Sequence, residues 1–590
     1  MMNKVKALFI TLGKGIKYLW REHHFLVPIS MWKDYFLKFK RRSIHRSGIL
    51  YYDLNNFGDY NRWLDKHVDF YQKKEVKLSK AKIIIIIEAI DFNQNDIFST
   101  IASIRKQKNK NFEIIILTNK KIENNDEYKF FYVADKEEMF GVINNYSLEF
   151  KESYFFILSA GDLLEDYTLS LVSECIAMNP EVDVIYGDED DIVNGGKFNA
   201  KFKPDFSPDT LLSYNYIGEA VLFKGDTIDK LGGFESSLGS RAIYDMLLRL
   251  INSQMTILHI PAIIFHKKDL KKRIDCDKSI VLNYLDKKGI IAKLEVDELT
   301  KYNLITYNLN PQPMVSIIIP TRDFYEITNN CLTSLFEKTT YKNYEVILVD
   351  NGSIQEETFK MFNYYKEKYN NFRVIRDEGE FNFSRLNNFA ASVAEGEVLV
   401  LLNNDTKIIS SNWLDIMVSY AMQPHVGAVG PKLLYEDNTV QHGGIILGLG
   451  DVAAHAYLNA KENDIGYMGD LRVPHDCGAV TAACLAIEKS KFIEVGMLNE
   501  DLKVAYNDVE LNIKLLKKGL FNVLVPNVKL YHLESKSRGL DTTKEKYKIF
   551  QRERSYMLEK YPDYIEKDPF YNDNFAKNEY DANFLLKDIK

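Results

Sequence analysis

The chain has 590 residues, of which 46% are apolar and 27% are charged, as is usual for soluble globular proteins. No run of about 18 uninterrupted apolar residues occurs, so we expect no membrane-spanning helix. The five cysteines form no CxxC pair, which argues against a disulfide framework and a thiolate zinc site and suits a reducing cytoplasm.

The net charge of −7 is unevenly distributed along the chain. Residues 1–46 hold eleven Lys and Arg against Glu22 and Asp34, so this segment is strongly basic and the remainder is acidic. Its apolar residues fall on one helical stripe with lysines opposite, and we expect residues 1–79 to form a basic amphipathic helical arm. Such a helix is typical of peripheral contact with an anionic membrane, here through residues 1–45, and equally of a helix that docks on its own domain.

Two parts of the chain repeat the same series of elements. Residues 82–119 contain KIIIIIEAI and NFEIIILTN, and residues 315–351 contain VSIIIPTRD and NYEVILVDN. An apolar strand, an amphipathic helix and a second apolar strand indicate a β-α-β unit and a parallel sheet. Later segments also match in pairs: 154–162 with 398–406, 231–250 with 495–516, and 261–266 with 526–532.

The repeat predicts an α/β fold with two tandem domains. We place the domains at residues 80–270 and 312–540, with a charged linker at 271–311 and a C-terminal helical tail at 541–590. Ligands of open parallel sheets bind at the carboxyl ends of the strands. In the second domain this is where Asp350 and the Asn403-Asn404-Asp405 triplet fall.

Asp405 follows an apolar strand and offers a hard oxygen ligand. Mg²⁺ and Mn²⁺ favour such ligands and commonly take one or two carboxylates, with phosphate oxygens and water completing the shell. A metal held in this way would neutralise the charge that develops on a departing diphosphate. The alternative is a simple strand-ending turn, because Asn and Asp bond their own backbone.

The segment 505–520 has apolar residues at helical spacing and a glycine where the helix would end. Asn507 and Glu510 are spaced like a capping box, so both could simply cap the helix, with Asp508 complementing its dipole. A carboxylate at a helix start that faces a cleft could instead accept a proton from a sugar hydroxyl. Further on, His532 and Arg538 lie in a polar segment that suits a loop closing over a phosphate.

A series of short motifs follows in one order from residue 316 to 539: SIIIPTRD, EVILVDNGS, FNFSRLNN, LLNNDT, VGAVGPKLLY, QHGG, AVTAACLAI, NDVEL and YHLESKSRG. This series resembles the family 2 glycosyltransferases, in particular those that build bacterial O-antigen, capsule and rhamnan-type surface polysaccharides. The first copy is similar to the same family through YGDEDDI and FKPDFSPDTLLSYNYIG. The resemblance implies two tandem domains of the A-type nucleotide-sugar transferase (Rossmann-like) fold.

The resemblance also implies a role for each matching residue. Asp405 would bind a divalent cation, Mn²⁺ or Mg²⁺, with His532 beside the metal. Asp508 would be the base of an inverting single displacement, and Glu510 would be its neighbour in the acceptor site. The nucleotide sugar would lie against Pro320, Thr321, Asp323, Asp350, Asn387, Asn403, Asn404 and Arg538.

The implied partners are a nucleoside-diphosphate sugar as donor and a growing bacterial surface polysaccharide, or its lipid-linked precursor, as acceptor. We expect no nucleic-acid partner. The expected location is the cytoplasm, with the inner face of the cytoplasmic membrane as a peripheral site if the arm binds lipid.

The first copy lacks the charged residues that this chemistry requires. Ser159-Ala160-Gly161 stand where the second copy has Asn403-Asn404-Asp405, and Ala242-Ile243 replace Asn507-Asp508. We therefore predict a degenerate first domain and one active site in the second. Two alternatives stay open: a bifunctional transferase with both domains active, and a non-catalytic carbohydrate-binding scaffold. The acidic run 188–191 is interpreted as a solvated turn, with a different metal site as the alternative.

Overall fold

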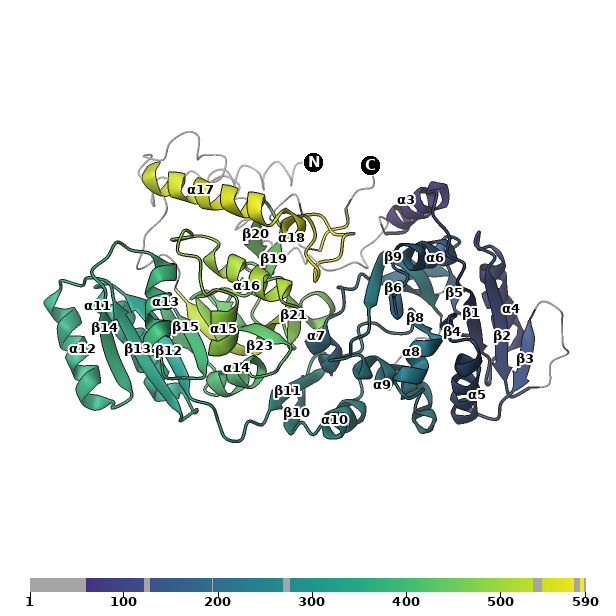
Figure 1. Cartoon of the computed structure of the whole chain (residues 1–590), viewed down its shortest axis with the longest axis horizontal. Coiled ribbons are helices and arrows are strands. Elements are labelled where there is room, and N and C mark those ends of the chain that lie inside the picture. Colours follow the sequence, from purple (N-terminus) through teal and green to yellow (C-terminus); the bar gives the residue numbers. More distant parts are fainter. Residues whose placement is uncertain are drawn as a thin grey trace, which may run out of the picture.

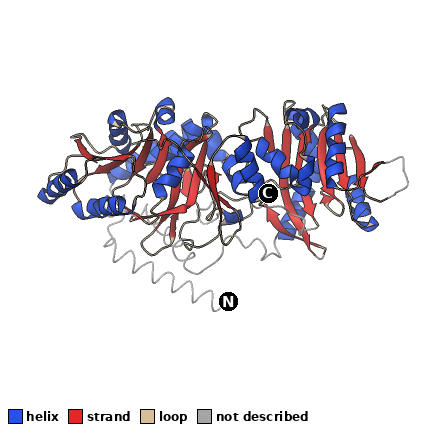
Figure 2. Cartoon of the chain, turned by 90° about the horizontal axis from the view of Figure 1, so that it is seen from below, coloured by secondary structure: helices blue, strands red, loops and turns tan. Residues whose placement is uncertain are grey.

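The computed structural model describes residues 60–120, 128–193, 195–268, 276–533, 544–577 and 584–587. Two α/β domains lie side by side, each built around one large mixed sheet, so the predicted fold class is confirmed (Figure 1). Helices flank the strands of both sheets (Figure 2). The arm is described only from α3 (Tyr60–Lys73), so the predicted membrane contact through residues 1–45 lies outside the described residues, as does Arg538.

The first sheet has the strand order β3-β2-β1-β4-β8-β6-β9-β5, with β7 paired to β6. Its central strands are buried on both faces, which explains why β1 is a nearly unbroken isoleucine run. The strands are β1 (Ile83–Glu88), β2 (Phe112–Thr118), β3 (Lys129–Tyr132), β4 (Tyr154–Ser159), β5 (Leu163–Leu164), β6 (Val184–Val193), β7 (Gly196–Lys201), β8 (Val221–Lys224) and β9 (Ile257–Lys267). The helices are α4 (Gln94–Arg105), α5 (Lys136–Glu149), α6 (Thr168–Met178), α7 (Pro208–Ser213), α8 (Gly225–Lys230) and α9 (Ala242–Arg249).

The second sheet has the order β14-β13-β12-β15-β22-β17-β23-β16, which repeats the first sheet strand for strand. Strands β18 and β21 join it at β17 and β23. The strands are β12 (Val315–Thr321), β13 (Tyr344–Asp350), β14 (Phe372–Arg376), β15 (Val398–Leu402), β16 (Thr406–Ile408), β17 (Val426–Leu434), β18 (Val440–His442), β21 (His475–Cys477), β22 (Cys484–Glu488) and β23 (Phe521–His532), and β19 (Ile445–Leu447) pairs separately with β20 (Ala453–His455). The helices are α11 (Tyr325–Lys338), α12 (Glu356–Lys368), α13 (Phe383–Val393), α14 (Trp413–Ala421), α15 (Lys489–Glu494) and α16 (Asn507–Lys517).

The segment predicted as a linker contains regular structure. It holds α10 (Lys278–Lys287) and an antiparallel pair, β10 (Ala292–Val296) and β11 (Asn303–Tyr307). Alternate side chains of β11 are buried, and Asn303 Nδ2 donates to the Leu212 carbonyl of the first domain at 3.2 Å. Arg472 of the second domain pairs with Asp297 at 2.6 Å. The segment therefore packs against both domains instead of spanning them freely.

Among the described residues of the C-terminal tail, the helices are α17 (Lys544–Lys560) and α18 (Pro562–Glu566). Helix α17 lies over the second domain, and the chain then runs back toward the first (Figure 1). Asp568 Oδ2 accepts from the Leu447 amide at 2.7 Å, and Asn572 Nδ2 donates to the Asp188 carboxylate at 3.0 Å. The tail thus connects the two domains through buried hydrogen bonds.

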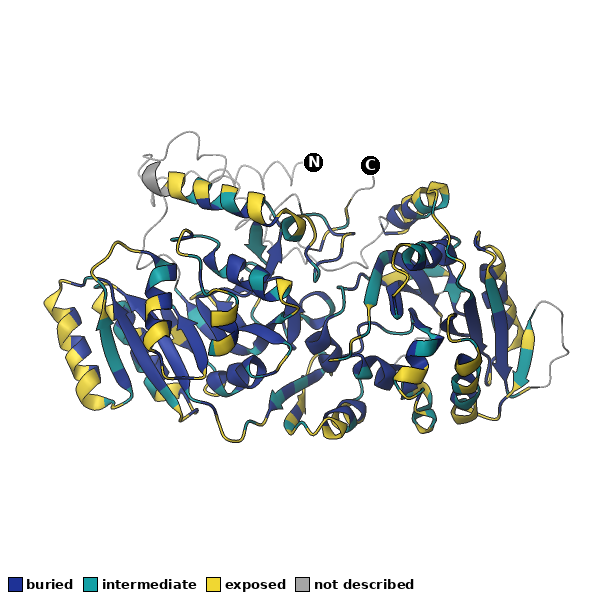
Figure 3. Ribbon diagram, viewed as in Figure 1, coloured by how far each residue is buried: buried dark blue, intermediate teal, exposed yellow. Residues whose placement is uncertain are grey.

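The acidic run 188–191 lies on strand β6 and is buried, so the interpretation as a solvated turn is wrong. Each acid has a partner: His259 bonds Asp188 at 2.9 Å, Lys203 bonds Glu189 at 2.9 Å, His266 bonds Asp190, and Asn199 bonds Asp191 at 3.0 Å. Buried carboxylates require such partners, because an unpaired charge is costly to desolvate. Figure 3 shows the sheet strands as buried and the exposed residues gathered on outer helices such as α12.

None of the described helices is both long and apolar enough to cross a membrane.

Candidate functional site

The Asn403-Asn404-Asp405 turn follows β15 at the carboxyl ends of the parallel strands β12 and β13. Asn404 Nδ2 donates to the hydroxyls of Thr321 and Thr328, each at 3.1 Å. These bonds fix the turn to the end of β12 and to α11. The structure therefore brings Asn404 and Thr321 together, and their side chains bond one another.

Asp405 and His532 face each other across the pairing of β16 with β23. Asp405 Oδ1 is 3.2 Å from His532 Nε2, and both side chains are buried. The other ring nitrogen of His532 bonds the Gln441 side chain at 2.9 Å, which fixes the orientation of the ring. Asn403 Nδ2 lies 3.4 Å from the same Nε2. One carboxylate, one imidazole and one amide thus converge at this end of the sheet.

This donor set suits a cation that takes few protein ligands. Mg²⁺ and Mn²⁺ often bind one or two protein groups and complete their shell with phosphate oxygens and water. Within the described ranges no group of three or more His, Cys, Asp and Glu side chains is arranged to hold a metal alone. Asp405 and His532 therefore fit a cation that arrives with a phosphorylated substrate, and do not form a closed structural site.

Two predicted donor-site carboxylates shape the loop after β13. Asp323 Oδ1 accepts from the amides of Ile354 and Gln355, both at 2.9 Å. Asp350 accepts from the Ser353 amide at 2.9 Å and also pairs with Arg376. The two side chains hold one wall of the expected nucleotide pocket in place.

Pro320 and Asn387 are both buried. Pro320 belongs to the buried strand β12 and pairs in register with Val349. Asn387 is fully buried in α13, where its Nδ2 donates to the Phe383 carbonyl at 2.8 Å. Its Oδ1 is buried and has no hydrogen-bond partner among the residues that the structure describes. Neither residue presents an exposed side chain to a ligand in this conformation.

Asp508 lies in the first turn of α16 and is half-buried. Its Oδ2 accepts from the Ala482 amide at 3.1 Å and its Oδ1 from the Val509 amide at 2.8 Å. The next carbonyl, that of Ala483, accepts from the Asn403 amide at 2.9 Å. The short segment before β22 therefore connects Asp508 to the turn that carries Asp405, and the two carboxylates share one edge of the sheet.

Glu510 is held by residues that motif analysis did not identify. Its Oε1 accepts from the Tyr561 hydroxyl at 2.8 Å, and its Oε2 pairs with Lys514 at 3.0 Å. Only 3% of Glu510 is exposed. The predicted capping box does not form, because Tyr506 occupies the N-cap position and makes no side-chain cap bond. Tyr561 stands 51 residues further along the chain, and no spacing rule could indicate this contact.

The first domain has a counterpart of this site with different charges. Strand β5 pairs with β9 as β16 pairs with β23, with Leu163 opposite His266 where Thr406 is opposite His532. In this register Asp162 corresponds to Asp405, whereas the sequence comparison assigned Gly161 to that position. Lys267 Nζ is buried, lies 3.3 Å from Asp162 Oδ2 and also pairs with Glu219. The Lys267 ammonium therefore neutralises the Asp162 and Glu219 carboxylates at this end of the first sheet.

His266 is the counterpart of His532 in the first domain, and its ion pair predicts that this domain loses stability in acid. His266 Nε2 lies 3.0 Å from Glu165, which also pairs with Lys197. Burial alone would raise the pKa of Glu165, but His266 and Lys197 outweigh it and hold that pKa at about 2, against an ordinary 4.5. The unfolded chain therefore takes up this proton at a higher pH than the folded chain, and the stabilisation, roughly 3 kcal/mol, is lost as the pH falls from about 4.5 to 2.

Urea unfolding of Glu165→Gln and wild type at pH 7 and pH 3 measures this effect. We expect the variant to be less stable at pH 7 and the difference to shrink at pH 3. The matched control is Glu152→Gln, because Glu152 is 85% exposed and pairs with Lys224 at the surface. A difference that is the same at both pH values would contradict the assignment.

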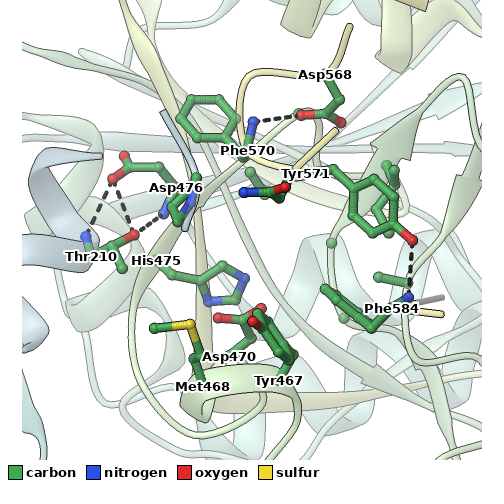
Figure 4. A pocket seen from close by; sticks show the side chains of 18 of the residues that line it. Thr210, Tyr467, Met468, Asp470, His475, Asp476, Asp568, Phe570, Tyr571 and Phe584 are labelled. Carbon is green, nitrogen blue, oxygen red and sulfur yellow. Dashed lines mark hydrogen bonds between the residues drawn. The ribbon is translucent and has the colours of Figure 1, made fainter. Parts of the chain in front are cut away.

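A small cavity lies between the two domains and the C-terminal tail (Figure 4). Its volume of about 50 Å³ suits a few water molecules and not a nucleotide. Asp476 Oδ2 accepts from the Asp209 and Thr210 amides at 2.9 and 3.2 Å, across the domain interface. Burial raises the pKa of Asp568, which also lines the cavity, to about 6. Neither Asp405 nor Asp508 lines this cavity, which belongs to the interface.

Comparison with known families gives a match in the second domain. Residues 316–496 match the sequence profile of the family described as "Glycosyl transferase family 2". This range contains β12 to β22 and the Asn403-Asn404-Asp405 turn. The match does not extend over the first domain. In the structure, the likeness between the two domains therefore rests on their shared strand order.

Two curated relatives extend the similarity over most of the chain. The uncharacterized protein y4gI of Sinorhizobium fredii is 37% identical over 441 residues, which are 72% of this chain and 48% of that protein. The O-antigen biosynthesis protein RfbC of Myxococcus xanthus is 32% identical over 403 residues, 66% of this chain and 31% of that protein. The chain thus spans about half and about a third of the length of these relatives.

Solved structures resemble the chain only in part. GalNAc-T7 with UDP, GalNAc and Mn²⁺ aligns with 46% of this chain and 53% of its own, at a TM-score of 0.37 and 18% identity. The mannosyltransferase PcManGT from Pyrobaculum calidifontis, in complex with GDP-Man and Mn²⁺, aligns with 42% of this chain and 62% of its own, at a TM-score of 0.31 and 18% identity.

Proposed function

We propose that this chain, whose residues 316–496 form a family 2 glycosyltransferase domain, transfers a sugar from a nucleoside-diphosphate sugar to a growing surface polysaccharide or its lipid-linked precursor. The observation that carries the proposal is the link between the Asn403-Asn404-Asp405 turn and Asp508 through Ala482 and Ala483. A carboxylate suited to a cation and a carboxylate suited to a base lie at one edge of the second sheet. The polysaccharide class is suggested by the name of the Myxococcus relative.

In this proposal Asp405 and His532 would hold Mn²⁺ or Mg²⁺ when the donor binds. The bound cation supplies positive charge that stabilises the leaving diphosphate. Gln441 keeps the His532 ring in place, and Asn404 keeps the turn in place through Thr321. The protein thereby binds and orients the donor before reaction, which is where much of the rate enhancement of such transfers arises.

Asp508 acts as the general base. Its two oxygens each accept one backbone N–H bond, which holds the carboxylate while further lone pairs stay available for a proton. The acceptor hydroxyl loses its proton to Asp508 and attacks the anomeric carbon from the face opposite the nucleoside diphosphate, so the sugar configuration inverts. Glu510 is engaged by Tyr561 and Lys514, and we assign it to the support of α16 and not to contact with the acceptor.

The first domain is proposed to be catalytically silent. Lys267 already neutralises Asp162 and Glu219, so this edge of the first sheet does not offer a carboxylate that is available to a divalent cation. Ile243 stands at the position that corresponds to the base and cannot accept a proton. We further propose that residues 1–45 give peripheral contact with the inner face of the cytoplasmic membrane, through their basic charge.

A panel of UDP-, dTDP- and GDP-sugars, incubated with the full chain and Mn²⁺ or Mg²⁺, tests the proposal. We expect one donor class to release its nucleoside diphosphate, faster when a polysaccharide acceptor is present. A carbohydrate-binding scaffold would bind the acceptor and release none. A bifunctional transferase would form two linkages and lose one of them in Asp162→Ala.

A further inference from the structure

Helix α17 carries a buried carboxylate that binds the backbone just before the site. Glu553 is 2% exposed. Its Oε1 accepts from the amides of Lys503 and Val504 at 2.8 and 3.2 Å, and its Oε2 accepts from the Ala505 amide at 2.7 Å. The three donors are consecutive residues of one irregular segment, and the next residues lead into α16 and Asp508.

This segment depends on side chains for its conformation. Residues 499–506 form no helix or strand, so their amides lack the partners that regular structure supplies. On the other side, the Lys503 carbonyl accepts from the Phe383 amide at 3.0 Å. Tyr506 then takes a left-handed conformation, with φ of 60°, and directs the chain into α16. Hydrogen bonds to a carboxylate are stronger than neutral ones, so Glu553 is the dominant anchor of this turn.

The same C-terminal region contacts both flanks of Asp508. Asn499 Nδ2 donates to the Tyr556 hydroxyl at 3.0 Å, ahead of the helix. The Tyr561 hydroxyl donates to Glu510 at 2.8 Å, two residues beyond Asp508. Met557 is fully buried in an apolar cluster with Leu502 and with residues of α16. The tail therefore encloses the start of α16 from the solvent side.

We propose that Glu553 is a positioning residue for Asp508, and that α17 is in this way a working part of the transferase site. The proposal rests on the proposed function, in which Asp508 is the base. Glu553 holds residues 503–505 so that the Asp508 carboxylate is presented at the reacting distance from the acceptor hydroxyl. Small displacements of a reacting group are costly, about a hundredfold in rate for an error near 1 Å.

Glu553→Gln is the test variant. The glutamine amide can replace one acceptor oxygen but presents an N–H group to at least one of the three backbone donors. We expect kcat to fall roughly 10–100-fold, with the donor KM and the binding of nucleoside diphosphate with Mn²⁺ within about threefold of wild type. The matched control is Glu559→Gln, an exposed glutamate on the same helix, which should keep wild-type kcat.

The double variant Asp508→Asn with Glu553→Gln separates positioning from general support of the fold. If Glu553 acts through Asp508, adding Glu553→Gln to Asp508→Asn causes little further loss of kcat. A full additional loss, or a wild-type kcat for Glu553→Gln alone, would overturn the proposal. Should Glu553→Gln fail to fold, Glu553→Asp, which keeps the charge on a shorter side chain, is put through the same cycle with the same outcomes. A wild-type rate for Asp508→Asn would instead reject the proposed function.

Discussion

We expect Asp508→Asn to lower kcat for sugar transfer by roughly 10²–10⁴-fold, the usual contribution of a general base. Asparagine is close in size to aspartate and can still accept from the Ala482 or Val509 amide through its carbonyl oxygen, so the helix start should fold as before. What is lost is the group that accepts the proton from the acceptor hydroxyl. The measurement is the initial rate of linkage formation at saturating donor and acceptor, with the donor KM determined in parallel.

Asp501→Asn is the matched control for this variant. Asp501 is exposed and lies seven residues before Asp508 in the same segment, so the change removes the same charge without touching the site. We expect its kcat to equal that of wild type. An Asp508→Asn enzyme that transfers sugar at the wild-type rate would show that another group is the base.

The sheets could be predicted from sequence because their strands are buried on both faces. The sequence of such a strand is a run of apolar residues, and the runs at 83–88 and 315–321 form β1 and β12. The acidic run 188–191 misled the same reasoning, because its partners, among them Lys203 and His266, lie elsewhere in the chain. A buried charged strand and a solvated acidic turn have the same local composition, and only the fold distinguishes them.

The site could be predicted in its local parts but not in its long-range ones. Asp405 follows a recognisable strand and Asp508 lies at the start of a recognisable helix, so their positions were accessible to pattern and resemblance. The correspondence of Asp162 to Asp405 could not be predicted from the sequence, because it depends on a shift of one residue between the strand registers of the two copies. Glu553 and Tyr561 were also missed, because a buried contact across about 50 residues leaves no spacing signal.

The interface explains why an inactive first domain would be retained. Asp188, on strand β6 of the first domain, accepts hydrogen bonds from Asn572 and Asn574 of the tail. The same tail carries Glu553 and Tyr561, which hold the start of α16. The first domain therefore holds the later part of the tail, and the earlier part of the tail supports the start of α16. If the first domain is silent, as proposed, its role would be structural support of the second domain.

Removal of divalent cations is expected to abolish transfer. Treatment of the full chain with a chelator should lower the rate at least about a hundredfold, because the charge on the leaving diphosphate is then not neutralised. Adding Mn²⁺ or Mg²⁺ in excess should restore the rate in wild type. In Asp405→Ala the same addition should fail, because the remaining ligand, His532, brings no negative charge to hold the cation.

The informative comparison is Asp162→Ala, which removes the corresponding carboxylate of the first domain. Lys267 supplies the positive charge there, so this variant should keep the metal response of wild type, whatever it loses in stability. Binding of Mn²⁺ with nucleoside diphosphate, followed by calorimetry, gives a second readout that does not depend on turnover. If Asp405→Ala binds the cation and regains activity as wild type does, then the metal lies elsewhere and the turn after β15 has only a structural role. Loss of cation binding in Asp405→Ala but not in Asp162→Ala would show that, of the two domains, the second binds the cation with the nucleoside diphosphate.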